Sequence, residues 1–376
     1  MFLRYALVCL MTLLAACGTM PRGAGLQTEV LAKGDDGSRP ASDTAQPAEF
    51  AIEAISRASL QRFASWPAVG ENGLPWIKRV DQPNGRILAP GDTVTLTIWS
   101  TEDNGLLTTN GQRVVNLPPT PLSSTGQLFL PYIGQIKLSG MSPDHARAEV
   151  EKAYGKVIAS AQVQLAVTEG RQSTASLVAG VANPGSFPLV DRDVTILDLL
   201  AQGGGVASDL VNPQIRLQRG KRTYGTSMTR LLADTEMNTT LVGGDRVFIE
   251  EDSRYFLSLG ASGSKAQHRF PQDSVSALDA ISIIGGLSAD RANAQGVLVL
   301  RSYPASSLRS DSSGPRNSRT IFTLDLTSAD GLFSAGAFQI RPGDLIYVTE
   351  SPLIGTRNLF GIIGSVFGLA NTASNL

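Results

Sequence analysis

The sequence predicts an α+β protein of several domains, preceded by an export signal and followed by an amphipathic membrane helix. Three observations lead to this expectation. A short turn pattern that contains glycine and aspartate occurs three times, each time before a strand-like run. A pattern typical of a short helix occurs twice with identical internal spacing. The chain also ends in an apolar stretch in which only Arg357 is charged.

The N-terminus predicts export and lipid attachment. Arg4 precedes an apolar run, residues 5–14, of about ten residues, which is the length of a signal-peptide core rather than a membrane span. The run ends in Leu14-Ala15-Ala16-Cys17, which resembles the lipobox of bacterial lipoproteins and implies cleavage before Cys17 and lipid on that residue. The alternative is an ordinary secretory signal with an incidental cysteine. Residue 18 is Gly rather than Asp, so the resemblance implies sorting to the outer membrane.

Composition excludes several functional classes. The chain has two cysteines, and Cys9 lies in the signal, so the mature protein has no internal disulfide and no second thiol for a metal. A net charge of −1 without a basic stripe argues against binding nucleic acid. Residues 18–46 are rich in Gly, Ser, Asp and Pro, so we expect residues 17–48 to form a flexible tether.

The turn pattern is an apolar residue, any residue, Pro or Gly, then Gly-Asp, any residue and an apolar residue. It occupies residues 88–94, 241–247 and 340–346. Glycine permits a positive φ, and an aspartate can accept hydrogen bonds from nearby backbone amides. We expect these residues to build the fold rather than a chemical site; they are Pro90, Gly91, Asp92, Gly244, Asp245, Gly343 and Asp344.

The helix pattern predicts a duplicated α+β unit. Leu197-Asp198 followed by Gly204-Gly205 matches Leu278-Asp279 followed by Gly285-Gly286. The apolar residues around each Leu-Asp pair suit a short helix that the glycines end. The two copies are expected at 173–252 and 254–350, and the second carries an extra polar loop over residues 302–318.

A different α+β domain is expected at 81–170, after an approach segment at 49–80. It begins with a strand over 92–99, in which core packing is the expected role of Trp99. A strand pair follows at 126–136, then a helix that Ser142-Pro143 begins, then a strand at 162–167. The roles of Trp66 and Trp76, in the approach segment, are left open.

The signal is expected at residues 1–16. The C-terminal segment, residues 352–376, is expected to be a membrane helix. Eighteen helical residues extend about 27 Å, close to the apolar thickness of about 30 Å of a bilayer. On a helical wheel a small and polar stripe, expected to line a channel or pack between helices, comprises Arg357, Asn358, Gly361, Gly364, Ser365 and Gly368. The face expected to contact lipid comprises Leu359, Ile362, Ile363, Val366 and Phe367. The alternative is an amphipathic helix on the body or on the membrane surface.

Several of these motifs together carry a family resemblance. Pro90-Gly91-Asp92 with Ile98-Trp99, then Gly126, Pro131-Tyr132-Ile133-Gly134 and Gly140, resembles the polysaccharide export domain. The two copies of the repeated unit resemble soluble-ligand-binding β-grasp (SLBB) repeats. With the lipobox, their order resembles the Wza-like outer-membrane polysaccharide export lipoproteins over nearly the whole mature chain. One departure is that the second copy has residues 260–264 where the first has Pro184-Gly185.

The resemblance implies a passive export channel. The chain would form a homo-oligomeric ring, an octamer by resemblance, whose C-terminal helices form an α-helical barrel in the bacterial outer membrane while the lipid-anchored body lies in the periplasm. The implied partners are capsular or secreted polysaccharide and an inner-membrane polysaccharide co-polymerase, with no cofactor. His145 and His268, the second expected in a polar loop, have no metal-ligand partner at useful spacing. We therefore expect no metal site and no enzyme.

Two other functions compete with the channel. One is a lipid-anchored periplasmic scaffold or sugar-binding module without its own pore. The other is a polysaccharide-processing enzyme, because a pair of carboxylates from distant positions could form a glycosidase site.

Overall fold

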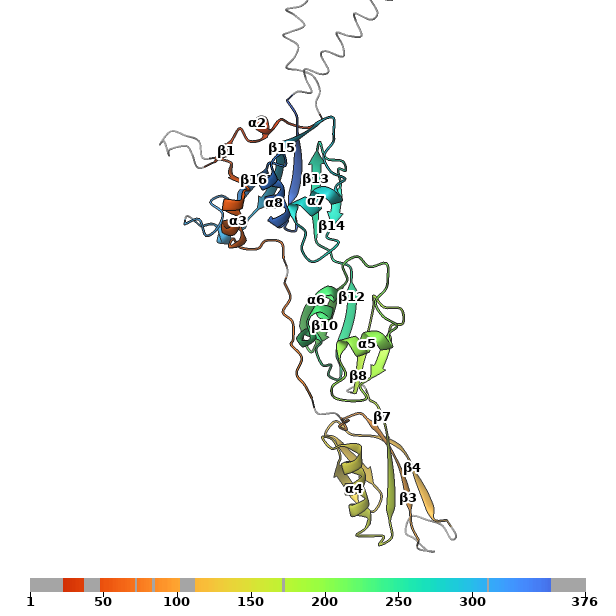
Figure 1. The fold of residues 1–376 in the computed structure, drawn as a ribbon. Helices are drawn as coiled ribbons and strands as arrows, with labels where there is room; N and C mark the ends of the chain where they lie inside the picture. The colour runs from red at the N-terminus through yellow and green to blue at the C-terminus, as the bar shows by residue number, and fades with distance from the viewer. Residues whose placement is uncertain are drawn as a thin grey trace, which may run out of the picture. The chain divides into compact units, whose positions relative to one another are not determined.

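The computed structural model describes residues 23–36, 48–71, 73–82, 85–101, 112–170, 173–309 and 311–352 (Figure 1). These residues form two compact units. One unit comprises residues 73–252, and the other combines the described residues up to 71 with residues 253–352. The N-terminal and C-terminal parts of the described chain therefore belong to one body.

The unit of residues 73–252 begins with the α+β domain expected at 81–170. Strand β3 (Thr93–Trp99) lies between β4 (Val114–Pro121) and β7 (Gln162–Thr168), and both pairings are antiparallel. A hairpin of β5 (Gln127–Leu130) and β6 (Gly134–Lys137) precedes helix α4 (Pro143–Tyr154). The Ser142 hydroxyl caps α4 by accepting a hydrogen bond from the His145 backbone amide at 3.3 Å. The predicted strand, hairpin, helix and strand are all present in that order, and β4 is an additional strand that the sequence analysis missed.

The expected core role of Trp99 is wrong. The alternating side chains Val94, Leu96 and Ile98 of β3 face the core and are at most 2% exposed, whereas Trp99 is 36% exposed. Successive side chains on a strand point to opposite faces, so Trp99 follows an inward residue and must point outward. Tyr154 at the end of α4 supplies the large aromatic side chain of this core instead.

The Tyr154 hydroxyl is buried without a hydrogen-bond partner among the described residues, and burial raises the pKa of Tyr154 to about 12. We expect Tyr154→Phe to stabilise this domain by about 1 kcal/mol, because the substitution removes a desolvated polar group and keeps the ring. Hydrogen exchange of the α4 and β3 amides measures that change. Tyr132→Phe, at a side chain that is 62% exposed, is the matched control and should change nothing. Destabilisation by Tyr154→Phe would show that the hydroxyl is satisfied.

The two expected copies of the repeated unit share one sheet topology. The first copy forms a five-stranded sheet in the order β11-β10-β12-β8-β9, and the second repeats that order as β16-β15-β17-β13-β14. The strands of the first copy are β8 (Thr174–Leu177), β9 (Gly185–Pro188), β10 (Gln214–Arg219), β11 (Arg222–Ser227) and β12 (Arg246–Glu250). Those of the second are β13 (Tyr255–Gly260), β14 (Gln267–Arg269), β15 (Ala292–Ser302), β16 (Arg319–Leu324) and β17 (Leu345–Glu350).

The helices of the two copies also correspond. Helices α5 (Ile196–Gln202) and α6 (Met228–Ala233) of the first copy correspond to α7 (Ala277–Ile283) and α8 (Ala329–Ala337) of the second. The 3₁₀ helices do not correspond, because η3 (Thr235–Met237) follows α6 whereas η4 (Ala305–Ser307) lies in the extra loop before β16. The aspartate of each Leu-Asp pair caps its helix. Asp198 accepts a hydrogen bond from the Thr195 amide at 2.9 Å, and Asp279 accepts one from the Ser276 amide at 3.0 Å. This shared cap explains the identical spacing.

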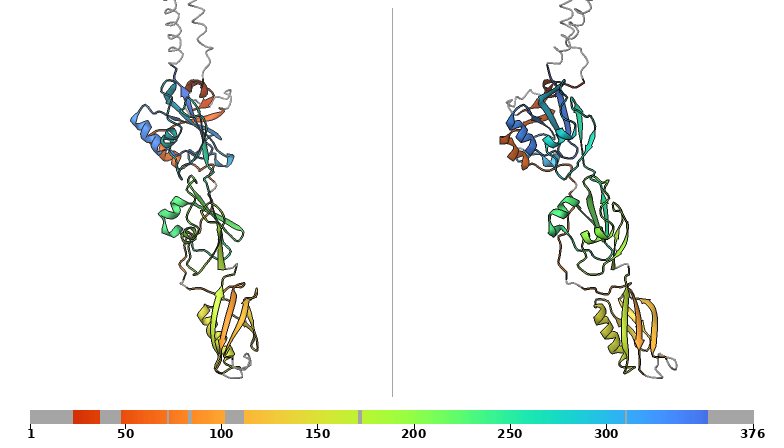
Figure 2. Two further views of the ribbon diagram at one scale, coloured as in Figure 1. Left: turned by 90° about the vertical axis from the view of Figure 1, so that its right-hand side faces the viewer. Right: turned by 45° about the vertical axis from the view of Figure 1, so that its right-hand side comes forward.

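The second copy contains more of the chain than its sequence range. Strand β2 (Phe50–Ala54) pairs parallel with β16, and β1 (Gly34–Asp35) pairs parallel with β2, which makes the sheet seven-stranded. Helices α2 (Gln27–Val30) and α3 (Arg57–Ala64) lie in the same unit, and Figure 2 shows these red and orange elements beside the blue strands. Residues 23–36, which we expected in a flexible tether, and residues 49–71, which we expected in an approach segment, are thus part of this fold.

Aromatic packing explains why the N-terminal residues join this unit. Phe63 and Trp66 lie in its core, and their rings contact Phe322 with centroids 5.1 and 5.8 Å apart. Edge-to-face and tilted contacts of this kind stabilise a core beyond the area that they bury. Residues 73–80 pack in the other unit, where the Trp76 indole donates a hydrogen bond to the Met237 carbonyl at 2.7 Å. Both tryptophans whose roles were left open therefore have structural positions.

Candidate functional site

The three glycine–aspartate turns share one geometry. Gly91, Gly244 and Gly343 have φ between 86° and 88°, which explains why glycine occupies each position. Each aspartate is almost fully buried and accepts a hydrogen bond from the backbone amide three residues earlier. The donors and distances are Ala89 to Asp92 at 2.9 Å, Val242 to Asp245 at 2.9 Å and Arg341 to Asp344 at 2.8 Å.

An arginine completes the turn in each copy of the repeated unit, and the sequence did not reveal it. Arg219 forms a two-pronged ion pair with Asp245, and Arg301 forms one with Asp344 at 2.9 and 2.7 Å. The arginines lie 26 and 43 residues before their aspartates. The second separation is longer because the polar loop intervenes, and this difference hides the correspondence in the sequence.

The two arginines also share a third hydrogen bond, which each donates to a backbone carbonyl. The second guanidinium nitrogen of Arg219 donates to the Thr240 carbonyl, and that of Arg301 donates to the Gln339 carbonyl, both at 2.9 Å. Burial disfavours the charged Arg301, but the carboxylate of Asp344 outweighs burial and raises the pKa of Arg301. The ion pair thus ties the strand before each loop to the turn that begins the last strand.

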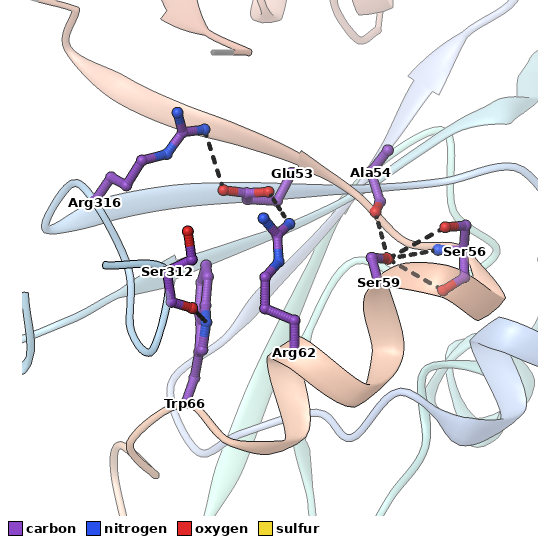
Figure 3. A network of polar contacts seen from close by, with 8 residues as sticks. All are labelled: Glu53, Ala54, Ser56, Ser59, Arg62, Trp66, Ser312 and Arg316. Atoms are coloured by element: carbon purple, nitrogen blue, oxygen red, sulfur yellow. Dashed lines mark hydrogen bonds and ion pairs between the residues drawn. The ribbon is translucent and has the colours of Figure 1, made fainter. Parts of the chain in front are cut away.

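A second network fixes the extra polar loop of the second copy (Figure 3). Glu53 on β2 is 5% exposed and accepts from Arg62 on α3 and, at 3.3 Å, from Arg316 in the loop. The Trp66 indole donates to the Ser312 carbonyl at 3.2 Å. The loop that the sequence marks as an insertion is therefore held by the N-terminal segment.

Glu53→Ala should loosen this loop, because the substitution leaves two arginines without their shared buried acceptor. We expect trypsin to cleave after Arg309 and Arg316 about tenfold faster, as a loss of 1–2 kcal/mol implies. Glu49→Ala, which removes an exposed pair with Lys33, is the control and should leave the cleavage rate unchanged. Equal rates in the two variants would contradict the role of Glu53.

The two ends of the described chain meet at the C-terminal end of strand β17, inside the seven-stranded sheet. The Gly23 amide donates to Glu350 Oε1 at 3.1 Å, and the Gly25 amide donates to the Tyr347 hydroxyl at 2.7 Å. The Glu350 amide in turn donates to the Gly25 carbonyl at 3.2 Å. Strand β17 thus brings residues 23–25 beside the point where the described chain ends. Sequence reasoning missed this contact because it joins residues that are more than 300 positions apart.

The residues predicted to contact the membrane lie outside the described part of the chain. These are Cys17 and, in the segment 353–376, Arg357, Asn358, Leu359, Gly361, Ile362, Ile363, Gly364, Ser365, Val366, Phe367 and Gly368. Among the helices that the structure does describe, each is too short or too polar to cross a bilayer.

The described residues also contain no cluster of three or more His, Cys, Asp or Glu side chains that could hold a metal ion. His145 lies on α4, as expected. His268 lies on strand β14 rather than in a polar loop, and its Nε2 is 2.9 Å from the Ser258 hydroxyl. Its partner is therefore a hydroxyl group on the neighbouring strand β13.

Comparison with known proteins shows what the chain is similar to. Residues 80–168 match the family described as polysaccharide biosynthesis/export protein. The chain is 25% identical to the capsule polysaccharide export protein BexD of Haemophilus influenzae, over 97% of this chain and 96% of that protein. It is 24% identical to the capsule polysaccharide export outer membrane protein CtrA of Neisseria meningitidis, over 76% of this chain and 78% of that protein. It is 27% identical to the EPS I polysaccharide export outer membrane protein EpsA of Ralstonia solanacearum, over 64% of this chain and 62% of that protein.

These relatives are named as export proteins rather than enzymes, in agreement with the expectation that this chain is not an enzyme. The matched range coincides with the β3–α4–β7 domain, and the relationship to BexD extends over both copies of the repeated unit. The chain therefore resembles outer-membrane polysaccharide export proteins over most of its length, and its residues 80–168 match the polysaccharide biosynthesis/export family.

Proposed function

We propose that this chain is one subunit of a homo-oligomeric channel, an octamer by resemblance, through which capsular or secreted polysaccharide leaves the cell. In this proposal lipid is attached to Cys17, the body lies in the periplasm, and an inner-membrane polysaccharide co-polymerase delivers the polymer. The duplicated units would be SLBB repeats, and residues 352–376 would form an α-helical barrel in the outer membrane. The relatives are export proteins, which supports the general role.

The single observation that carries the membrane arrangement is the contact of Gly23 and Gly25 with β17. Cys17 is six residues before Gly23, and six residues extend at most about 20 Å. A lipid on Cys17 would therefore hold the bilayer within about 20 Å of the C-terminal end of β17. Residue 352 follows that strand end by two positions, so a C-terminal membrane helix would enter the bilayer that carries the lipid.

The composition of the last segment supports a ring of helices rather than one isolated span. Gly361, Gly364 and Gly368 would allow close approach of neighbouring helices, and Arg357 would face the lumen or a neighbour. A lone helix with this stripe would place a charge and several small residues against lipid, which is unfavourable. A closed ring removes that cost.

Single-particle imaging of the lipidated protein in mild detergent tests the proposal. We expect closed rings with a central cavity and a narrow collar built from the C-terminal segments. Cys17→Ser should remove the lipid mass from the protein and release it from the membrane fraction if the lipid contributes to anchoring. Strictly monomeric particles would contradict the channel and favour a lipid-anchored scaffold without a pore.

A further inference from the structure

A cavity of about 420 Å³ lies in the unit of residues 73–252, where the segment that leads into β3 passes the first copy of the repeated unit. That volume is within the range of about 300–1,000 Å³ for small-molecule sites. Four of the side chains that line it are basic and one is acidic. The basic residues are Lys78, Arg86, Arg192 and Arg219, and the acidic one is Asp191.

Arg86 is the basic group whose hydrogen bonds are incomplete. Its side chain is 17% exposed, and its Nη1 donates to Glu169 at 2.7 Å. Its Nε and Nη2 are buried and have no hydrogen-bond acceptor among the described residues. A buried guanidinium that leaves two nitrogens unsatisfied is costly, so an additional acceptor at this position would be favourable.

Asp92 does not fill that role, although it is the nearest other carboxylate. Its Oδ2 is 3.6 Å from Arg86 Nη2, beyond hydrogen-bond distance. Both of its oxygens already accept other bonds: Oδ2 from the Ala89 amide, and Oδ1 from the Gly170 amide and the Ser173 hydroxyl at 2.7 Å. Arg219 is likewise committed to Asp245. The orphan donors of Arg86 therefore lack an acceptor among the described residues, and a ligand in the cavity reaches them when the Arg86 side chain turns towards it.

The remaining walls suit a sugar ring. Leu189 and Leu241 contribute apolar surface, against which the C–H face of a pyranose can pack. Arg192 is exposed on the lining, where its guanidinium donates to Gln82 at 3.1 Å and can turn towards a second anionic oxygen. Donors from an arginine fork match the planar or tetrahedral oxyanions of carboxylate and phosphate groups.

We propose that this cavity binds a single sugar residue that carries an oxyanion, with Arg86 Nε and Nη2 as the principal donors. The shared chemistry is a hexose-sized ring with one anionic group, supplied either by a sugar acid or by a sugar phosphate. The site does not require the channel, so it stands or falls independently of the C-terminal helix and of the ring.

Calorimetric titration of the detergent-extracted, lipidated protein tests this with glucuronate, glucose 6-phosphate, glucose and inorganic phosphate. We expect at least one of the two anionic sugars to bind about tenfold or more tightly than glucose, because glucose lacks the charge-assisted bonds. The tighter of the two identifies the source of the oxyanion. Inorganic phosphate should bind more weakly than the better sugar, because it lacks the ring.

Arg86→Gln should weaken binding of the better sugar about tenfold, and Arg192→Gln, at an exposed side chain, should weaken it several-fold without affecting the fold. Arg222→Gln removes an exposed arginine on β11 that is outside the cavity and should leave binding unchanged. Urea midpoints of all three variants check that each is folded. The proposal is overturned if no probe shows saturable binding, if glucose or inorganic phosphate binds as tightly as the anionic sugars, or if folded Arg86→Gln and Arg192→Gln both bind like the parent.

Discussion

Deleting residues 353–376 should abolish polymer at the cell surface while leaving a folded, lipid-anchored body. The core residues of the described part of the chain all lie before residue 352, so the deletion is designed to remove only the proposed barrel. Without the barrel, a hydrophilic polymer would have to cross about 30 Å of hydrocarbon, which is prohibitive. The measurement is surface polysaccharide in cells that carry the deletion, together with the amount and membrane association of the protein.

Point substitutions test the packing of this segment more specifically than the deletion does. Gly361→Leu with Gly364→Leu keeps the segment apolar and of equal length but prevents close approach of neighbouring helices. We expect loss of both export and detergent-stable rings. Ile362→Leu, on the face expected to contact lipid, is the matched control and should retain both. Normal export from the deletion variant would instead favour the periplasmic scaffold.

Asp344→Ala should destabilise the unit that contains residues 253–352 by about 3–5 kcal/mol, because it leaves the charge of Arg301 buried without its partner. The guanidinium carbon of Arg301 also lies 5.1 and 5.2 Å from the ring centroids of Phe322 and Phe338, so turning it to solvent would break these contacts. The Arg301 side chain is 8% exposed and the Asp344 side chain is 1% exposed. The charge therefore has no route to water that preserves the core.

Urea unfolding followed by Trp66 fluorescence measures the effect, because Trp66 is in this core whereas Trp76 and Trp99 belong to the other unit. Trp76 and Trp99 are replaced by Phe in every variant so that only Trp66 reports. Arg309→Ala, in the exposed loop, is the control. Replacing both members of the pair, as Arg301→Met with Asp344→Leu, should recover most of the lost stability. A loss for Asp344→Ala no larger than for the control would show that the pair is dispensable.

Local chemistry accounts for what was predictable from the sequence. The positive φ of Gly91, Gly244 and Gly343 follows from a residue type that tolerates it, and the caps at Thr195 and Ser276 follow from short side chains three residues before an aspartate. These features depend on neighbours within a few positions, so the turns, the repeated helices and the family resemblance could be read directly. The alternation of inward and outward side chains along β3 could also be predicted from the sequence. It places Trp99 on the outer face of the strand, against our expectation of core packing.

Tertiary structure alone decided which distant segments complete each unit. Residues 23–36 have the composition of a tether, yet β1 pairs with the outer side of β2, whose backbone groups would otherwise be unpaired, and Leu26 forms a bridge with Glu350 at the end of β17. Phe63 and Trp66 join the core of the second copy, and Arg219 and Arg301 find their aspartates across loops of different length. Partners of this kind are selected by burial and by the need to satisfy buried polar groups, and both depend on positions in space that sequence separation does not encode.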